Sequence, residues 1–165
     1  MSDNGTERIP INPIMNIPVP WVFVLVYFMG VGIQHLLPLA LFPRKPFWSH
    51  LFYVVGITLT VLGSLLAGWC LKIFRNARTT TVPFKTPSQL ITRGPYTFSR
   101  NPMYVSLTMI YIGEAFIFKA GWSLTLLLSV LAYLNWVVIP VEEKRLAVTF
   151  SRDYAAYCSR VRRWL

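Results

Sequence analysis

Two short polar motifs stand at the boundaries of apolar segments. Residues 100–104 read Arg-Asn-Pro-Met-Tyr, where a basic loop enters a hydrophobic stretch, and Glu142 and Glu143 follow the next hydrophobic stretch. Each stretch is long enough to cross a bilayer as a helix, so an up-and-down hairpin would bring both motifs to one membrane surface. A cation, a phenol and two carboxylates at one depth predict a polar site for a charged, water-soluble ligand beside a lipid-facing opening.

Each of these residues also has a structural explanation. A lone Arg at a membrane boundary, such as Arg100, commonly extends its charge to the interface and anchors a helix. Glu142 and Glu143 would suit the start of a helix, where carboxylates oppose the positive end of the helix dipole. Tyr96 and Tyr104 would suit an interfacial aromatic belt. Because all of them fall at the same expected depth, we favour a binding site.

The composition places the chain in a membrane. It has 165 residues, of which 55% are hydrophobic and 13% charged, and its mean hydropathy is +0.50. Continuous apolar runs at 21–42, 47–74, 102–118 and 122–139 predict an all-α integral membrane protein with about four transmembrane helices. We expect one domain over residues 1–165, with a flexible lead at 1–19, a long loop at 75–101 and the motifs within 75–165.

The net charge of +10 raises the question of nucleic-acid binding, which we discount. With both termini inside, every Lys and Arg except Arg44, Lys45 and Lys119 lies on one side of the membrane. This asymmetry follows the positive-inside rule, so the charge reports cytoplasmic termini and contact with anionic lipid. Cys70 and Cys158 both fall near that face and are expected to be free thiols.

Three further patterns make structural predictions. Gly56, Gly63 and Gly68 in the second span would allow another helix to approach closely. Pro140 is expected to end the fourth span, and residues 141–164 are amphipathic, which predicts a C-terminal helix lying in the membrane interface. Glu114 is an ionisable residue inside the third span, and we expect it to form a buried hydrogen bond with His35.

The ordered motifs resemble those of the membrane methyltransferase superfamily, which includes isoprenylcysteine carboxyl methyltransferases, phosphatidylethanolamine N-methyltransferases and small bacterial relatives. The matching pieces are Thr-Val-Pro-Phe at 81–84, Gly-Pro-Tyr at 94–96 with residues 100–104, the Glu pair, and Tyr-x-x-Tyr at 154–157. The resemblance implies methyl transfer from S-adenosylmethionine to a hydrophobic or lipid-like acceptor at the cytoplasmic face. It also implies a cytoplasmic cofactor-binding loop and favours the bacterial inner membrane.

The resemblance also assigns residues. It implies a cofactor site made of Ser88, Gln89, Leu90, Ile91, Tyr96, Arg100, Asn101, Pro102, Met103, Tyr104 and Glu142, with Arg100, Glu142 and Glu143 as catalytic candidates and no metal. An Arg and a phenol suit a carboxylate and a sulfonium, and a carboxylate suits an ammonium or a ribose hydroxyl.

Two departures bear on the acceptor. Many relatives have His at the position of Asn101, although phosphatidylethanolamine enzymes also show Asn-Pro-Met-Tyr. Isoprenylcysteine enzymes carry an Arg shortly before the Glu pair, whereas residues 135–140 read Asn-Trp-Val-Val-Ile-Pro. The sequence therefore predicts no cation there and favours a neutral or amine-bearing acceptor.

Two other functions stay open alongside methyl transfer. Sterol reductases show a similar Arg-x-Pro-x-Tyr region and use NADPH, and a non-enzymatic membrane scaffold could retain the same fold. Oxygen, nitrogen and sulfur all stay open as the methylated atom, as does the oligomeric state.

Overall fold

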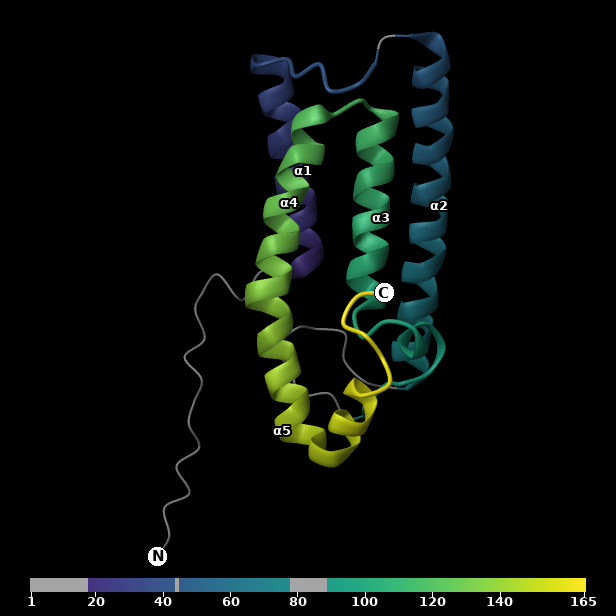
Figure 1. Cartoon of the computed structure of the whole chain (residues 1–165), viewed down its shortest axis with the longest axis vertical. Coiled ribbons are helices and arrows are strands. Elements are labelled where there is room, and N and C mark those ends of the chain that lie inside the picture. The colour runs from purple at the N-terminus through teal and green to yellow at the C-terminus, as the bar shows by residue number, and fades with distance from the viewer. Residues whose placement is uncertain (1–17, 44, 78–88) are drawn as a thin grey trace, which may run out of the picture.

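The protein is a bundle of long helices, seen in a computed structural model that describes residues 18–43, 45–77 and 89–165 (Figure 1). Those residues form helices and connecting turns, with no strand among them, which confirms the all-α prediction. The elements are α1 (Val19–Leu36), α2 (Pro46–Asn76), the 3₁₀ turn η2 (Gly94–Thr97), α3 (Pro102–Ile117), α4 (Gly121–Tyr133), the π-helical segment η3 (Leu134–Val138) and α5 (Ile139–Cys158).

Three of these helical segments are long and apolar enough to cross a membrane. They are Val19–Leu36, Pro46–Asn76 and the continuous segment Gly121–Cys158, and Pro102–Ile117 is a shorter apolar helix beside them. The first span is shorter than its apolar run predicted, because α1 ends at Leu36 rather than at residue 42. Pro38 disfavours helical geometry at Leu37, which has φ −132° and ψ 84°.

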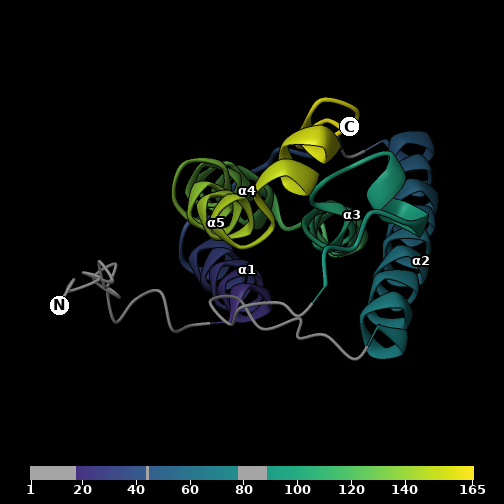
Figure 2. The same cartoon turned by 90° about the horizontal axis from the view of Figure 1, so that it is seen from below.

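The helices pack as two pairs, α2 along α3 and α1 along α4, with α3 lying between α2 and the other pair (Figure 2). Glycine makes the α2–α3 contact close. A Cβ atom on Gly56 would lie 2.7 Å from the Gly113 carbonyl oxygen, and one on Gly63 would lie 2.8 Å from the Ser106 carbonyl oxygen. A Cβ atom on Gly68 would meet nothing within 4 Å, so the expectation that Gly68 allows close helix packing is wrong.

A buried polar and aromatic cluster joins α1, α3 and α4. The Tyr111 hydroxyl donates to the Ser123 carbonyl oxygen at 2.8 Å, and the Ser123 hydroxyl donates to the Tyr27 carbonyl oxygen at 2.9 Å. The rings of Tyr27 and Tyr111 meet edge to face, with centroids 5.2 Å apart. These bonds hold α3 against the α1–α4 pair, because a buried donor without a partner is costly.

The expected pairing of Glu114 with His35 is wrong. Within the described residues no hydrogen bond or ion pair joins the two side chains, and His35 is exposed in the last turn of α1. The reason is the pairing of the helices, since α1 packs chiefly along α4 and makes few contacts with α3.

The helix that follows α4 does not stop at Pro140, which corrects a second expectation. Pro140 lies in the first turn of α5, directly after the π-helical segment η3. A proline inside an α-helix lacks one backbone hydrogen bond and clashes with the preceding turn, and the wider π turn relieves both problems. The C-terminal helix therefore continues the fourth span instead of starting as a separate interfacial helix.

The end of α5 turns back toward the bundle. Ser151 has φ 35° and ψ −102°, which kinks the helix, and the chain after Cys158 returns to the beginning of α3 (Figure 1). Tyr154 and Tyr157 are buried by this return. We call the end of the bundle that holds η2, the start of α3 and α5 the motif end.

Candidate polar site and adjoining cavity

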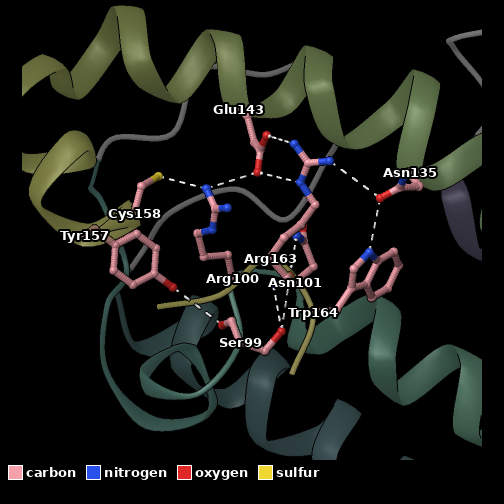
Figure 3. A network of polar contacts seen from close by, with 9 residues as sticks. All are labelled: Ser99, Arg100, Asn101, Asn135, Glu143, Tyr157, Cys158, Arg163 and Trp164. Atoms are coloured by element: carbon pink, nitrogen blue, oxygen red, sulfur yellow. Dashed lines mark hydrogen bonds and ion pairs between the residues drawn. The ribbon is translucent and has the colours of Figure 1, made fainter. Parts of the chain in front are cut away.

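Two arginines share one carboxylate at the motif end. Arg100 Nη1 lies 3.1 Å from Glu143 Oε1, and Arg163 donates to both Glu143 oxygens at 3.1 and 2.6 Å (Figure 3). Arg100 and Glu143 are mostly buried, with side chains 18% and 19% exposed. Two guanidinium groups facing one carboxylate leave one formal positive charge in a partly desolvated place.

Backbone hydrogen bonds bring these distant residues together. The Arg100 N–H donates to the Arg162 carbonyl oxygen at 2.9 Å, and the Asn101 side-chain amide donates to the Arg163 carbonyl oxygen at 2.9 Å. The buried Ser99 hydroxyl accepts the Asn101 N–H at 3.1 Å. The turn before α3 therefore holds the last residues of the chain by hydrogen bonds. These bonds place the Arg163 guanidinium next to Glu143 on α5.

Glu142 belongs to a different contact from its neighbour. The hydroxyl of Tyr104, buried in the first turn of α3, donates to Glu142 Oε1 at 2.7 Å. Consecutive residues of a helix point about 100° apart, which is why the two carboxylates of the pair separate. Glu142 thus contacts Tyr104, whereas Glu143 contacts the two arginines, so the Glu pair belongs to two neighbouring clusters.

Tyr96 lies beside these clusters as a buried wedge between α2 and α5. Its ring meets Phe74 edge to face at 5.6 Å, and its carbonyl oxygen accepts the Tyr157 hydroxyl at 2.7 Å. Burial raises the pKa of Tyr96 far above its usual value, and the neighbouring Cys70 thiol raises it further. The phenol is therefore neutral, and it fixes the turn that precedes Arg100.

The remaining predicted cofactor residues are placed unevenly. Pro102 is buried at the start of α3, and Met103 is half-buried beside it. Gln89 is exposed and Leu90 and Ile91 are half-buried, and none of the three makes a hydrogen bond to the clusters described above. Ser88 and the motif at 81–84 lie outside the described residues.

The arginine cluster, made of Arg100, Arg163 and Glu143, also contacts residues that the sequence analysis did not assign to a site. The Cys158 sulfur accepts a hydrogen bond from Arg100 Nη1 at 2.8 Å. Asn135 Oδ1 accepts from Trp164 Nε1 at 3.2 Å and, at a longer 3.5 Å, from Arg163 Nη1. The sequence predicted no cation near residues 135–140. This prediction is wrong, because the Arg163 side chain lies beside Asn135. The sequence argument against an anionic acceptor loses its basis.

A cavity of about 600 Å³ adjoins the arginine cluster. Its walls come from α3, from α4 with η3, and from the end of the chain, and they include Val105, Met109, Leu131, Asn135, Trp136 and Trp164. The lining is mostly apolar, and Trp136 is 74% exposed on the outer surface of the bundle. The cavity therefore opens to the lipid-facing side, and its size falls within the roughly 300–1,000 Å³ of small-molecule sites.

Arg100 has unused hydrogen-bonding capacity. Burial lowers its pKa, but the Glu143 carboxylate together with Cys158 and Tyr154 more than offsets this effect, so the pKa of Arg100 is raised and the group stays charged. Its Nε atom is buried and has no hydrogen-bond partner among the described residues. A buried N–H of a charged group is costly to leave unpaired, so Arg100 Nε is suited to donate to a hydrogen-bond acceptor on a bound ligand.

The helices and the sequence define an integral membrane protein. The family model for phospholipid methyltransferase matches residues 51–153, which include the start of α3, the Glu pair and most of the cavity. The chain belongs to this family. No curated protein and no solved structure matches it.

Proposed function

We propose that the protein transfers a methyl group from S-adenosylmethionine to a lipid-like acceptor at the cytoplasmic face of the membrane. One observation carries the proposal. The clusters of Arg100, Tyr104, Glu142 and Glu143 lie at the same end of the bundle as a cavity that opens toward lipid. A water-soluble donor and an apolar acceptor need such neighbouring sites, because their reacting atoms must meet.

The residues fit the proposed cofactor by their chemistry. The arginine cluster carries a formal positive charge and an unpaired buried donor, Arg100 Nε, which suit the carboxylate of the cofactor. Glu142 is a half-buried carboxylate that suits the ammonium group or the ribose hydroxyls. When bound, S-adenosylmethionine would supply an electrophilic methyl group on its sulfonium, for transfer to a lone pair of the acceptor as the carbon–sulfur bond breaks and leaves a neutral thioether.

In this proposal the protein acts mainly by positioning. Arg100 binds the donor, and Glu143 holds the Arg100 guanidinium in place. Tyr104 orients Glu142 through the 2.7 Å hydrogen bond and keeps one carboxylate oxygen occupied. Apolar walls exclude water from the adjoining cavity, which strengthens these electrostatic contacts.

The proposed location follows the charges. Arg93, Arg100, Arg163 and the basic positions of α5 lie at the motif end, and Lys45 and Lys119 lie at the other. By the positive-inside rule the motif end faces the cytoplasm, which places the donor site where the cofactor is made available. The inner membrane of a bacterium fits this arrangement.

Calorimetry with S-adenosylhomocysteine tests the donor site directly. The full chain, purified in detergent, should bind this product with saturable heat, and NADPH should give none. Heat from NADPH with none from S-adenosylhomocysteine would instead support a reductase.

A further inference from the structure

The two arginines of the arginine cluster contact Glu143 in different ways. Arg163 uses both sides of its guanidinium, with Nε 3.1 Å from Glu143 Oε1 and Nη2 2.6 Å from Oε2. Arg100 reaches the same carboxylate with Nη1 alone, and its buried Nε has no partner among the described residues (Figure 3). The donors of Arg163 are therefore mostly taken up by Glu143, whereas Arg100 keeps one buried donor for a ligand.

The arginine cluster is cationic only because Arg163 belongs to it. Arg100 and Glu143 alone would form a neutral ion pair, and Arg163 adds the one net positive charge. The neighbouring Glu142 does not cancel this charge, because it interacts electrostatically with a further cation, Arg145. The Glu143 side chain is only 19% exposed, so water screens these charges less than it would on an open surface.

The backbone places Arg163 independently of its side chain. The Arg163 carbonyl oxygen accepts a hydrogen bond from the Asn101 amide at 2.9 Å, and the Arg162 carbonyl oxygen accepts the Arg100 N–H at 2.9 Å. Both donors belong to the turn before α3, which also carries the Arg100 side chain. A change of the Arg163 side chain leaves these bonds in place, so its effect on the charge of the cluster can be measured in a folded protein.

We propose that Arg163 is a positioning residue of the donor site that acts through Glu143. Because Arg163 occupies this carboxylate, the charge and the Nε atom of Arg100 stay available to the carboxylate of the donor. Without Arg163, Glu143 would neutralise Arg100, and the donor would meet an ion pair with no net charge. The inference rests on the proposed function for the identity of the ligand, but its charge argument applies to any carboxylate.

A set of charge exchanges tests this role by calorimetry with S-adenosylhomocysteine on the full chain in detergent. Arg163→Gln removes the net charge of the cluster, and Glu143→Gln raises it to two. The double variant, with both replacements, returns the cluster to one positive charge. Arg163→Lys keeps the charge but loses the two-sided contact. Arg162→Gln is the matched control, since it removes the same charge from an exposed side chain one residue away.

Arg163→Gln should weaken binding about tenfold, because the ligand carboxylate loses the attraction of one charge in a partly desolvated site. The double variant and Arg163→Lys should each regain most of that affinity, and Arg162→Gln should bind as the unaltered protein does. Thermal unfolding shows which variants fold. If Arg163→Gln does not, Arg163→Lys still decides, together with a loss of affinity from Glu143→Gln to the double variant.

Unchanged affinity in a folded Arg163→Gln variant would overturn the inference. A folded double variant that binds no better than Arg163→Gln would also overturn it, because Arg163 would then only hold the chain in place. Acetate, a simple carboxylate, provides a test without the cofactor. Sodium acetate should raise the unfolding midpoint above that in sodium chloride for the unaltered protein and Arg162→Gln, and not for Arg163→Gln.

The two ligands separate this inference from the proposed function. No binding of S-adenosylhomocysteine, together with an acetate effect that depends on Arg163, would end the methyltransferase proposal alone. Normal binding of S-adenosylhomocysteine with the same affinity in Arg163→Gln would end the role of Arg163 alone. The absence of both effects would end both proposals.

Discussion

Arg163 meets Glu143 through two hydrogen bonds, 3.1 and 2.6 Å long, between residues 20 positions apart in the chain. Arg100 approaches the same carboxylate from the turn before α3. The contact therefore ties three segments together at the motif end, and the positions of the donor-site residues depend on it.

Arg163→Ala should destabilise the fold. The change removes a two-pronged hydrogen bond to a mostly buried carboxylate, and because the Arg163 side chain is 35% exposed we expect the lower end of about 1.5–3 kcal/mol. Arg162→Ala is the matched control, since that side chain is exposed and only its carbonyl oxygen contacts the site. Thermal unfolding in one detergent measures both, and equal midpoints would contradict the role of Arg163.

Gly63→Ala should weaken the α2–α3 contact. The added methyl group would lie 2.8 Å from the Ser106 carbonyl oxygen, and overpacking of this kind typically costs about 1–3 kcal/mol. Gly68→Ala, in the same helix, meets nothing within 4 Å and should be neutral or slightly stabilising. If both variants unfold at the same temperature as the unaltered protein, the helices do not approach as closely as described.

The general fold followed from the sequence because apolar length alone predicts membrane helices. What the sequence could not show was how the helices pair. The contact expected between Glu114 and His35 failed for this reason, because α1 packs chiefly along α4 and not along α3. Gly68 failed for a different reason. It lies five residues beyond Gly63, about 140° round the helix, whereas Gly56 and Gly63 are seven residues apart and share the face that meets α3.

The sequence predicted that Arg100, Tyr104 and Glu142 lie at the same end of the bundle, because they flank spans that run in opposite directions, and the structure brings them there. Their role in binding a cofactor stays a prediction. Arg163 was read only as part of a basic tail, because nothing local indicates that the chain turns at Ser151 and returns to α3. The prediction that Pro140 ends the fourth span failed because the sequence gives no clear sign of the π turn that accommodates this proline within the helix.

Labelling of single cysteines should establish which face of the membrane the motif end occupies. Ser159→Cys and Lys45→Cys place exposed thiols at opposite ends of the bundle. In intact cells an impermeant maleimide should label only Lys45→Cys, and lysed cells should allow both. Labelling of Ser159→Cys in intact cells would reverse the proposed topology and remove the donor site from the cytoplasm.

Arg100→Lys and Glu142→Gln should each weaken binding of S-adenosylhomocysteine. Loss of a hydrogen bond to a charged group costs about 1.5–3 kcal/mol, which corresponds to about ten- to a hundredfold in affinity. Both replacements keep the shape of the site, because lysine stays cationic and glutamine still accepts the Tyr104 hydroxyl. Lys144→Ala, an exposed neighbour on α5, should bind normally. Unchanged affinity in both site variants would remove these residues from the donor site.

Transfer of a labelled methyl group tests the central claim most directly. The purified protein is incubated with S-adenosylmethionine labelled in its methyl carbon and with a total lipid extract, and label is counted in the organic phase. We predict label in an extractable lipid-like product, in amounts that fall at least about tenfold for Glu142→Gln and stay unchanged for Lys144→Ala. A protein that binds S-adenosylhomocysteine but leaves the organic phase unlabelled with every lipid fraction would contradict the account.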